Sequence, residues 1–314
     1  MLSWCCNRNR VRVVGSPEPM RHSSANRQSL RLLLSVCVLL LAGPGCNRKQ
    51  ASAPPAQFEV PSLSVAGEAG STTRGEIAGV RYLECMTGGA LPDERVPMIV
   101  ALHPMGGDPE DFLPQLRHYR RRARLILPYG HPSGGMYIWY DSVRDDVAAP
   151  LVTREADRIA AMLLALVSVR PTVGKPLVTG FSQGGIMTFA LAVTHPEALA
   201  AAFPIGGLLP PSLYPSRAIV SMPRPSKLPP VSAFHGAADL AVPTRGARAS
   251  IAELRWAGYT AELREYAGVG HDISDAEQDE LLERIGRVAD DLVVSAPRGQ
   301  PPREAEYVRP SLVE

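Results

Sequence analysis

The chain has 314 residues, of which 45% are hydrophobic and 20% charged, with 33 basic side chains against 31 acidic ones. This length suits one large α/β domain or two small ones, and the apolar fraction is enough for a sizeable core. The formal net charge of +2 gives no extended positive field, so nucleic acid is not an expected partner.

The first 46 residues have the layout of an export signal and are expected to lie outside the folded domain. Arginines precede or open a short apolar stretch that starts at Leu30, and small residues lead to Cys46. The stretch is shorter than the about 20 residues that a membrane-spanning helix needs. It resembles a bacterial lipoprotein signal, which implies export to the cell envelope and membrane attachment through a lipid on Cys46. Plain secretion and an uncleaved anchor are the alternatives, and a polar linker is expected at 47–74.

Four of the five cysteines lie in or at the end of this signal, and Cys85 alone remains in the expected domain. A disulfide within the domain is therefore not possible. We expect Cys85 to be a small buried side chain rather than a reactive thiol.

From about residue 75, strand-like and helix-like segments alternate. The basic run 117–124 is expected to be the solvated face of a helix that leads into the next strand. Strand–helix alternation predicts an α/β domain at 75–294, with a mainly parallel central sheet and helices on both faces. The expected strands are 79–86, 98–102, 125–128, 176–181, 200–207, 231–236 and 260–268, and the expected helices are 155–169, 183–196, 244–258 and 275–294.

Two segments have a different character. Residues 204–230 are rich in proline and connect two expected strands, and a connection this long is either a lid or a surface loop. Residues 295–314 are polar and proline-rich, which is typical of a disordered tail.

The sequence Gly-Phe-Ser-Gln-Gly at 180–184 places Ser182 between an expected strand and an expected helix. This strand–turn–helix context predicts a nucleophile elbow, in which a tight turn exposes the serine hydroxyl. Gly180 and Gly184 are needed because side chains at these positions would collide with neighbouring elements. The nearby helix N-terminus favours developing negative charge.

A serine needs a base and an orienting acid to act as a nucleophile. In such a fold, these partners follow in the order acid, then histidine, on turns after later strands. Asp239 follows the expected strand 231–236, and His271 follows the strand 260–268. The sequence therefore predicts a catalytic triad of Ser182, Asp239 and His271.

The oxyanion hole is expected to use two backbone amides. One is the amide of Gln183, the residue after the nucleophile, and the other is the amide of Met105 in the glycine-containing turn after strand 98–102. His103 belongs to the same turn, and we interpret it as a structural histidine or pocket wall rather than a base.

The segments LHPMGG, WYD, GFSQGG, HGAADLAVP and GVGHDIS together resemble the phospholipase/carboxylesterase family of α/β-hydrolases, which includes acyl-protein thioesterase-like enzymes. The resemblance spans residues 80–290. It implies an α/β-hydrolase fold and a serine hydrolase that uses no metal and no organic cofactor. The family's nucleophile, acid, base and oxyanion donors correspond to the residues already assigned to these roles. Pro104 is a departure, because the family usually has glycine after this histidine.

The expected substrate is a small-molecule carboxylic ester. Trp139, Tyr140 and Phe181 are expected to supply apolar walls near the reacting serine. The same triad would serve a thioesterase, an aryl-ester or polyester hydrolase, or a peptidase. A non-catalytic binding protein on a hydrolase scaffold is a further alternative.

Overall fold

The computed structural model describes residues 72–141, 145–215 and 227–296. The chain divides into two units, Met1–Phe58 and Glu59–Glu314, and every described residue belongs to the second. The export signal, Cys46 and nearly all of the predicted tail therefore lie outside the described residues. In the part that is described, no helix combines the length and the apolar character required to cross a membrane.

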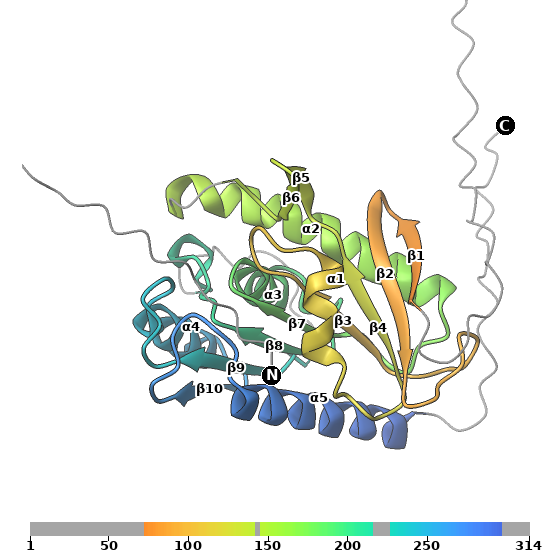
Figure 1. Cartoon of the computed structure of the whole chain (residues 1–314). Helices are drawn as coiled ribbons and strands as arrows, with labels where there is room; N and C mark the ends of the chain where they lie inside the picture. Colours follow the sequence, from red (N-terminus) through yellow and green to blue (C-terminus); the bar gives the residue numbers. More distant parts are fainter. Residues whose placement is uncertain (1–71, 142–144, 216–226, 297–314) are drawn as a thin grey trace, which may run out of the picture. The chain divides into compact units, whose positions relative to one another are not determined.

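The second unit is built on an eight-stranded sheet with the order β1-β2-β4-β3-β7-β8-β9-β10 (Figure 1). The six strands from β4 to β10 in this order run parallel, while β1 and β2 pair antiparallel at one edge. This confirms the predicted mainly parallel sheet. The strands are β1 (Thr72–Ile77), β2 (Val80–Thr87), β3 (Met98–Leu102), β4 (Ala123–Pro128), β7 (Leu177–Phe181), β8 (Ala201–Ile205), β9 (Val231–Gly236) and β10 (Ala261–Tyr266).

A separate two-stranded hairpin and several helical segments complete this unit. The hairpin consists of β5 (His131–Ser133) and β6 (Met136–Ile138). The helices are α1 (Pro109–Phe112), α2 (Asp145–Val169), α3 (Gln183–Thr194), α4 (Thr244–Trp256) and α5 (Asp275–Ser295), with 3-10 turns at Leu113–Leu116 and Pro211–Leu213.

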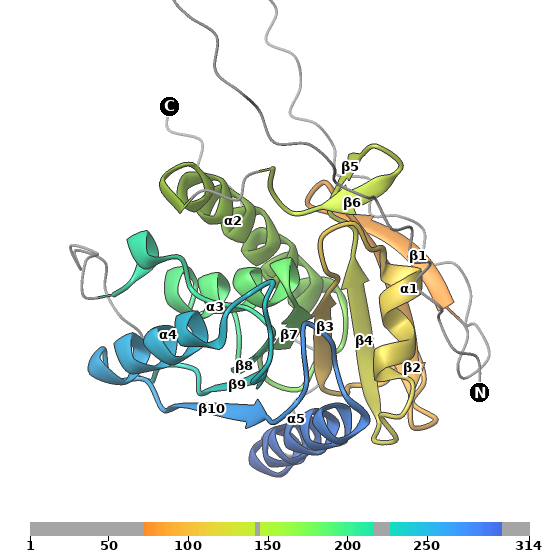
Figure 2. The same ribbon diagram turned by 60° about the vertical axis from the view of Figure 1, so that its left-hand side comes forward.

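Helices cover both faces of the sheet, as predicted. Side chains alternate along each strand, so each face of the sheet presents apolar residues that a layer of helices buries. In β3, Met98 and Leu102 face the core beneath α2, α3 and α4, while Ile99 and Ala101 face the core beneath α1 and α5. Figure 2 shows α2, α3 and α4 on one side of the sheet, with α1 and α5 on the other. The carboxyl ends of the parallel strands therefore lie between two layers of helix, which is where the site is built.

The structure differs from two of the sequence expectations about local elements. Strand β1 was not predicted, and it begins three residues before the expected domain boundary. Helix α2 begins at Asp145, ten residues before the expected start, and it contains Pro150. Proline is uncommon inside a helix because it lacks an amide hydrogen, so the sequence pattern indicated only the part beyond it.

The predicted helix over 117–124 is wrong. Residues 117–122 form turns and a bend, and Arg124 lies in β4 with its side chain fully buried. Its guanidinium pairs with the Glu84 carboxylate of β2 and donates to the Pro92 carbonyl at 2.7 Å. A buried charge requires such partners, so one member of the basic run belongs to the interior rather than to a solvated face.

Two further expectations concern Cys85 and the proline-rich connection. Cys85 is half-buried and unpaired, and burial raises the pKa of its thiol. At the start of the connection, Leu209 and Tyr214 are buried against the core, while residues 216–226 lie outside the described residues. Whether this segment is a lid or a surface loop stays a prediction.

Candidate active site

Ser182 lies at the turn between β7 and α3 with φ 56° and ψ −116°, a conformation that non-glycine residues rarely adopt. The turn packs so tightly that a Cβ atom at Gly180 would lie 2.5 Å from the Gly184 carbonyl oxygen. A Cβ atom at Gly184 would collide with the Leu102 carbonyl oxygen at the end of β3. Both glycines therefore have the role that the sequence predicted, and the strain holds the hydroxyl at the carboxyl edge of the sheet.

Three side chains from distant segments form a hydrogen-bonded row at this edge. His271 Nε2 lies 2.8 Å from Ser182 Oγ, and His271 Nδ1 lies 2.7 Å from Asp239 Oδ2. Asp239 follows β9, His271 follows β10, and these strands pair in parallel. Parallel pairing brings both turns to the same end of the sheet as Ser182, so the structure brings the predicted residues together.

The Asp239 carboxylate is buried and held from two directions. Its Oδ1 accepts the amides of Ala241 at 2.9 Å and Val242 at 2.8 Å. His235 Nε2 lies 3.3 Å from Oδ2 and donates to the Val242 carbonyl at 2.7 Å. Sequence reasoning did not assign a role to His235, although it stands four residues before Asp239 at the end of the same strand.

Phe181 packs beside the histidine of this row. Its ring centroid lies 4.9 Å from that of His271 with an interplanar angle of 30°. Gly206, with φ 53°, leaves room for the ring, because a Cβ atom there would lie 2.8 Å from it. Phe181 is half-buried, and its role as a substrate wall stays a prediction.

His103 lies in the turn after β3 and is fully buried. Its Nδ1–H donates to the Pro104 carbonyl at 2.8 Å, and its Nε2 accepts the Gly130 amide at 3.1 Å. Burial lowers the pKa of its imidazole, so the ring is held neutral. These contacts agree with the structural interpretation of His103 and leave no ring nitrogen free for catalysis.

The two amides expected to donate to the oxyanion belong to Gln183, which directly follows Ser182, and to Met105, which lies in the turn after β3. Gln183 is the first residue of α3, where helix geometry leaves amides without an intrahelical acceptor. The start of α3 packs against β3, since a Cβ atom at Gly184 would lie 2.8 Å from the His103 carbonyl oxygen. Within the described ranges, the backbone hydrogen bonds of turns, loops and caps include none donated by either amide. Their use as oxyanion donors stays a prediction.

The Gln183 side chain connects this region to the residues after the hairpin, a contact that sequence reasoning missed. Its Oε1 accepts the Trp139 backbone amide at 2.8 Å, and its Nε2 donates to the Tyr140 carbonyl at 2.8 Å. The Trp139 indole N–H then donates to the His103 carbonyl at 2.8 Å, and its ring stacks on the His103 ring at 4.6 Å. Trp139 thus links Gln183, through its backbone amide, to the turn that carries Met105, through its indole.

Trp139 and Tyr140 were expected to line a substrate pocket. They are only 1% and 9% exposed, and both belong to the core beneath α2 and α3. Their contacts in the structure are positional, and their role as pocket walls stays a prediction.

Glu277, near the start of α5, is a second residue that the sequence did not reveal. It is fully buried, and neither carboxylate oxygen has a hydrogen-bond partner. Burial, together with the negative charges of Asp272 and Asp239, raises the pKa of this carboxyl to about 7. The side chain therefore lies in the electrostatic environment of the row without bonding to it.

This arrangement can perform proton transfer. A neutral imidazole whose Nδ1–H is bonded to Asp239 has its Nε2 lone pair directed at the Ser182 hydroxyl, which is the geometry for general-base activation of a serine. Across the described ranges, no group of three or more histidine, cysteine or acidic side chains is arranged to hold a metal ion.

The chain is similar to known proteins of one family. A model of the phospholipase/carboxylesterase family matches residues 122–287, which is just over half of the chain and includes Ser182, Asp239 and His271. The chain belongs to the phospholipase/carboxylesterase family. The fold predicted from the resemblance, that of an α/β-hydrolase, is confirmed by this match and by solved esterases of the same fold.

Curated relatives in this family come from plants. The chain is 33% identical to carboxylesterase SOBER1 of Arabidopsis thaliana over 100 residues, covering 32% of this chain and 42% of that protein. It is 29% identical to a probable inactive carboxylesterase of Oryza sativa over 153 residues, covering 46% of this chain and 60% of that protein. The chain thus spans about half the length of the curated relatives it matches.

Solved structures share the fold at lower identity. The crystal structure of Arabidopsis thaliana SOBER1 has a TM-score of 0.54 at 23% identity and covers 61% of this chain and 98% of that one. Zea mays acyl-protein thioesterase 2 has a TM-score of 0.53 at 22% identity and covers 67% of this chain and 99% of that one. At this identity the likeness concerns the fold.

Proposed function

We propose that this family member hydrolyses carboxylic esters through an acyl-enzyme intermediate on Ser182. The observation that carries the proposal is the hydrogen-bonded row of Ser182, His271 and Asp239, with distances of 2.8 and 2.7 Å. The strained backbone at Ser182 supports it, because such strain persists where the surrounding structure enforces it for function.

The reaction follows from this geometry. His271 Nε2 takes the proton of Ser182 Oγ as the oxygen attacks the ester carbonyl carbon, and Asp239 stabilises the resulting imidazolium. The tetrahedral intermediate collapses, the alcohol leaves with the proton from His271, and an acyl-Ser182 remains. Water, activated by the same histidine, then attacks the acyl group and releases the acid.

The amides of Met105 and Gln183 are proposed to donate to the oxyanion. Each such donor contributes about 3 kcal/mol to transition-state stabilisation. Support comes from the Gln183 side chain and the Trp139 indole, which fix the two backbone segments relative to each other. The donors are therefore oriented before substrate binds.

The test uses purified protein with p-nitrophenyl acetate and butyrate, together with a fluorophosphonate probe that labels activated serines. We expect turnover by the wild-type protein, with the probe attached to Ser182 in a peptide mass map. Ser182→Ala should lose both signals, and Ser168→Ala, at an exposed serine of α2, should keep both. A Ser182→Ala protein with an unaltered rate would refute the proposal, as would an unlabelled wild-type protein that hydrolyses no ester.

A panel of substrates separates the reactions that share this triad. Oxygen esters, thioesters, aryl esters and anilides should be compared at equal concentration by kcat/KM. The proposed esterase should favour oxygen esters over anilides. A preference for thioesters or peptide-like anilides would assign the same residues to a different reaction. Absence of turnover with intact folding would favour the binding-protein alternative, which the probable inactive relative makes worth testing.

We also propose that the protein is exported and attached to a bacterial membrane through a lipid on Cys46. The support is the sequence from Leu30 to Cys46, with its short apolar stretch and small residues before the cysteine. Mass spectrometry of the mature N-terminus should find a diacylglyceryl-modified Cys46, and the protein should partition into the detergent phase. Cys46→Ser should abolish this partition, whereas Cys37→Ser within the apolar stretch should not. An unmodified chain that starts before residue 46 would contradict the proposal.

A further inference from the structure

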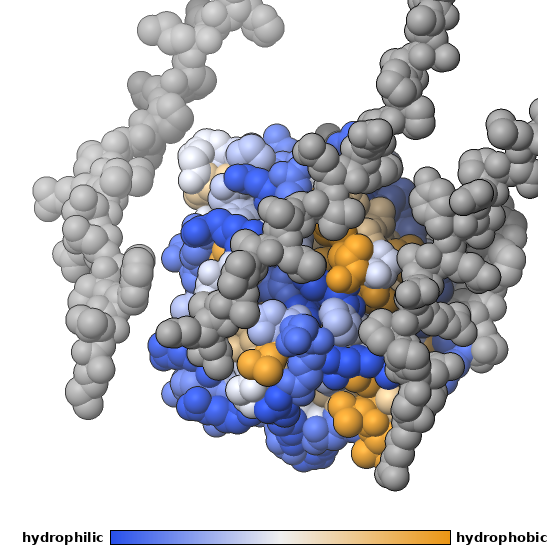
Figure 3. All heavy atoms as spheres, turned by 90° about the vertical axis from the view of Figure 1, so that its right-hand side faces the viewer, coloured by the Kyte–Doolittle hydropathy of each residue, from blue (hydrophilic) through white to orange (hydrophobic). Residues whose placement is uncertain are grey.

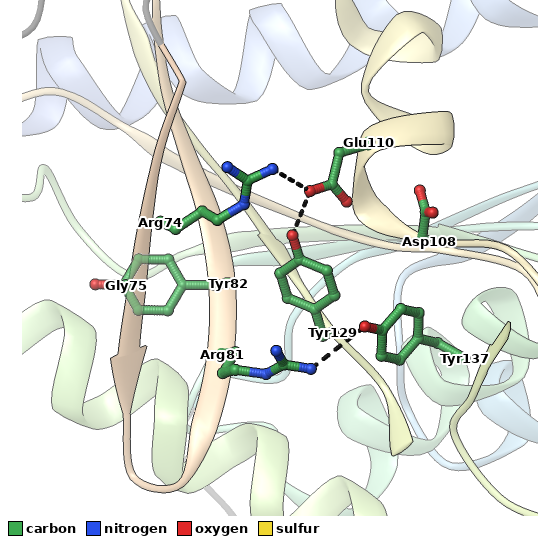
Figure 4. Close-up of a pocket in the computed structure, with 8 residues that line it drawn as sticks. All are labelled: Arg74, Gly75, Arg81, Tyr82, Asp108, Glu110, Tyr129 and Tyr137. Atoms are coloured by element: carbon green, nitrogen blue, oxygen red, sulfur yellow. Dashed lines mark hydrogen bonds and ion pairs between the residues drawn. The ribbon is translucent and has the colours of Figure 1, made fainter. Parts of the chain in front are cut away.

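A pocket of about 360 Å³ lies outside the hydrogen-bonded row, between the β1–β2 edge of the sheet, α1 and the β5–β6 hairpin. This volume is at the lower end of the range for small-molecule sites, about 300–1,000 Å³. Figure 4 shows three aromatic rings, two arginines and two acidic side chains around it. The lining residues are Arg74, Gly75, Arg81, Tyr82, Asp108, Glu110, Tyr129 and Tyr137.

The two arginines of the pocket differ in their partners. Arg74 lies 2.9 Å from Glu110, which also accepts the Tyr129 hydroxyl, so this cation is neutralised within the wall (Figure 4). Arg81 lies within ion-pair distance of no carboxylate among residues 72–141, 145–215 and 227–296. Its one side-chain hydrogen bond goes to the Tyr137 hydroxyl at 3.3 Å.

Aromatic rings hold the Arg81 guanidinium in place. The guanidinium carbon lies 5.1 Å from the Tyr129 ring centroid and 6.0 Å from the Tyr137 centroid. The two rings meet edge to face at 5.2 Å, so they form a rigid support. Stacking of this kind orients a guanidinium while leaving N–H groups free for an anion that presents two oxygens.

Asp108 is the remaining charge on the wall and opposes an incoming anion. Its Oδ1 accepts the Asp111 amide at 2.7 Å as the cap of α1, so part of its negative charge is already satisfied. The lining itself is rich in charged side chains and tyrosines, and Figure 3 shows mostly hydrophilic residues, with hydrophobic ones in separate patches, on the visible part of the side that is on the right in Figure 1. A polar ligand therefore suits this pocket better than an apolar one.

We propose that this pocket binds a small molecule through a carboxylate or phosphate group, with Arg81 as the charged donor and the Tyr137 hydroxyl beside it. An arginine without an acidic partner, stacked on aromatic rings in a cavity of molecular size, suits an anionic group that presents two oxygens to the guanidinium fork. The proposal is independent of the reaction assigned to Ser182.

The pocket shares its walls with the turn that carries Met105. Tyr137 accepts the Gly106 amide through its carbonyl oxygen at 2.9 Å, and Asp108 ends the same turn. A ligand in this pocket would thus lie beside the predicted oxyanion segment, while the pocket lining includes none of Ser182, Asp239 and His271.

The experiment measures anion binding to the purified full-length protein by isothermal titration calorimetry and ligand-observed NMR. Inorganic phosphate and benzoate are the two probes, and their relative affinity distinguishes a phosphate source from a carboxylate source. We expect saturable binding of at least one probe with a Kd on the order of 1–10 mM, which is typical of a single charged contact with few others.

Variants then locate the site. Arg81→Gln should weaken binding at least tenfold, and Arg81→Lys, which keeps the charge but loses the planar fork, should weaken it less. Arg120→Gln removes the same charge at an exposed position outside the pocket and should bind like the wild type. Ser182→Ala should also retain binding, because the site is separate from the reacting serine. Circular dichroism checks that each variant is folded.

Equal affinity in the wild type and in both Arg81 variants would overturn the proposal. The same holds if neither probe binds saturably, or if Ser182→Ala alone abolishes binding, since the anion would then occupy the serine site.

Discussion

The side-chain amide of Gln183 accepts the backbone amide of Trp139 and donates to the carbonyl of Tyr140, at 2.8 Å in each case. Gln183 follows the proposed nucleophile, and its own backbone amide is a proposed oxyanion donor. Under the proposed mechanism this residue has two separate functions: its backbone amide donates to the oxyanion, and its side chain fixes the segment that is bonded to the turn after β3.

We predict that Gln183→Ala lowers kcat for p-nitrophenyl butyrate by about tenfold or more and changes KM little. The backbone amide survives in this variant, so any loss reports on positioning rather than on removal of a donor, which costs about 10²–10³ in kcat. Steady-state kinetics measure the two parameters, and Gln115→Ala provides a glutamine control on the opposite side of the sheet. An unchanged kcat would show that the contacts to Trp139 and Tyr140 are structural alone.

Asp239→Asn should lower kcat by about 10³–10⁴ while the protein remains folded. An asparagine presents an amide in place of an acceptor to His271 Nδ1, which favours the tautomer whose Nε2 carries the hydrogen and cannot accept the serine proton. Steady-state kinetics measure the loss of kcat. Asp279→Asn, at an exposed position of α5, is the control and should have wild-type activity. A loss below tenfold would exclude Asp239 as the orienting acid.

Ser182→Gly and Ser182→Ala should both be inactive but should differ in stability. Alanine keeps the Cβ atom that makes φ 56° unfavourable, whereas glycine adopts this conformation readily. We expect Ser182→Gly to be more stable than Ser182→Ala by about 1 kcal/mol, the lower end of the cost of such strain. Urea denaturation of the two variants gives the comparison. If alanine were the more stable, the backbone at the turn would not be strained.

Because of Glu277, the free energy of unfolding should fall as the pH rises. Its pKa is raised from 4.5 to about 7 in the folded state, so the folded protein holds a proton that the unfolded chain releases. The stabilisation is fully present below pH 4.5 and is lost as the pH increases through 7. The difference between the two pKa values corresponds to about 3 kcal/mol.

Glu277→Gln should remove this dependence. The free energy of unfolding of the variant should match the wild type near pH 4 and exceed it near pH 8, as measured by urea denaturation across this range. Glu253→Gln provides the same change on an α4 residue that is not fully buried. Parallel pH profiles for wild type and Glu277→Gln would contradict the assignment.

Replacing only one member of the buried ion pair of Arg124 and Glu84 should lower the free energy of unfolding more than replacing both. Glu84→Gln leaves a fully buried guanidinium without its carboxylate and should destabilise the protein by about 3–5 kcal/mol. Replacement of both residues with apolar side chains of similar size, as in Glu84→Leu with Arg124→Met, should cost much less. Thermal denaturation of the single and double variants tests this. A double variant as unstable as Glu84→Gln would show that the ion pair itself contributes the stability.

Much of the fold could be predicted because local patterns specify it. The apolar runs of β3, β4 and β7 and the helical spacing of α5 appear directly in the sequence. Strand β1 was missed because it lies on the edge of the sheet and its sequence, TTRGEI, has Ile77 as its one large apolar residue. Arg124 was misplaced because a run of arginines at 120–124 reads as a solvated surface, and only its neighbours in the sheet show that the last of them is buried.

By itself, the sequence determined which residues have the chemistry for acyl transfer and the order in which they occur: a serine in a glycine-flanked turn, then an acid, then a histidine, each after a strand. Tertiary structure alone decided the distances among them, the contacts of Gln183 with Trp139 and Tyr140, the unpaired state of Glu277 and the exposure of Arg81 in a pocket. The physical reason is that motifs depend on backbone conformation over a few residues. Hydrogen bonds, desolvation and ion pairing depend instead on segments far apart in the chain, and only the folded packing brings these together.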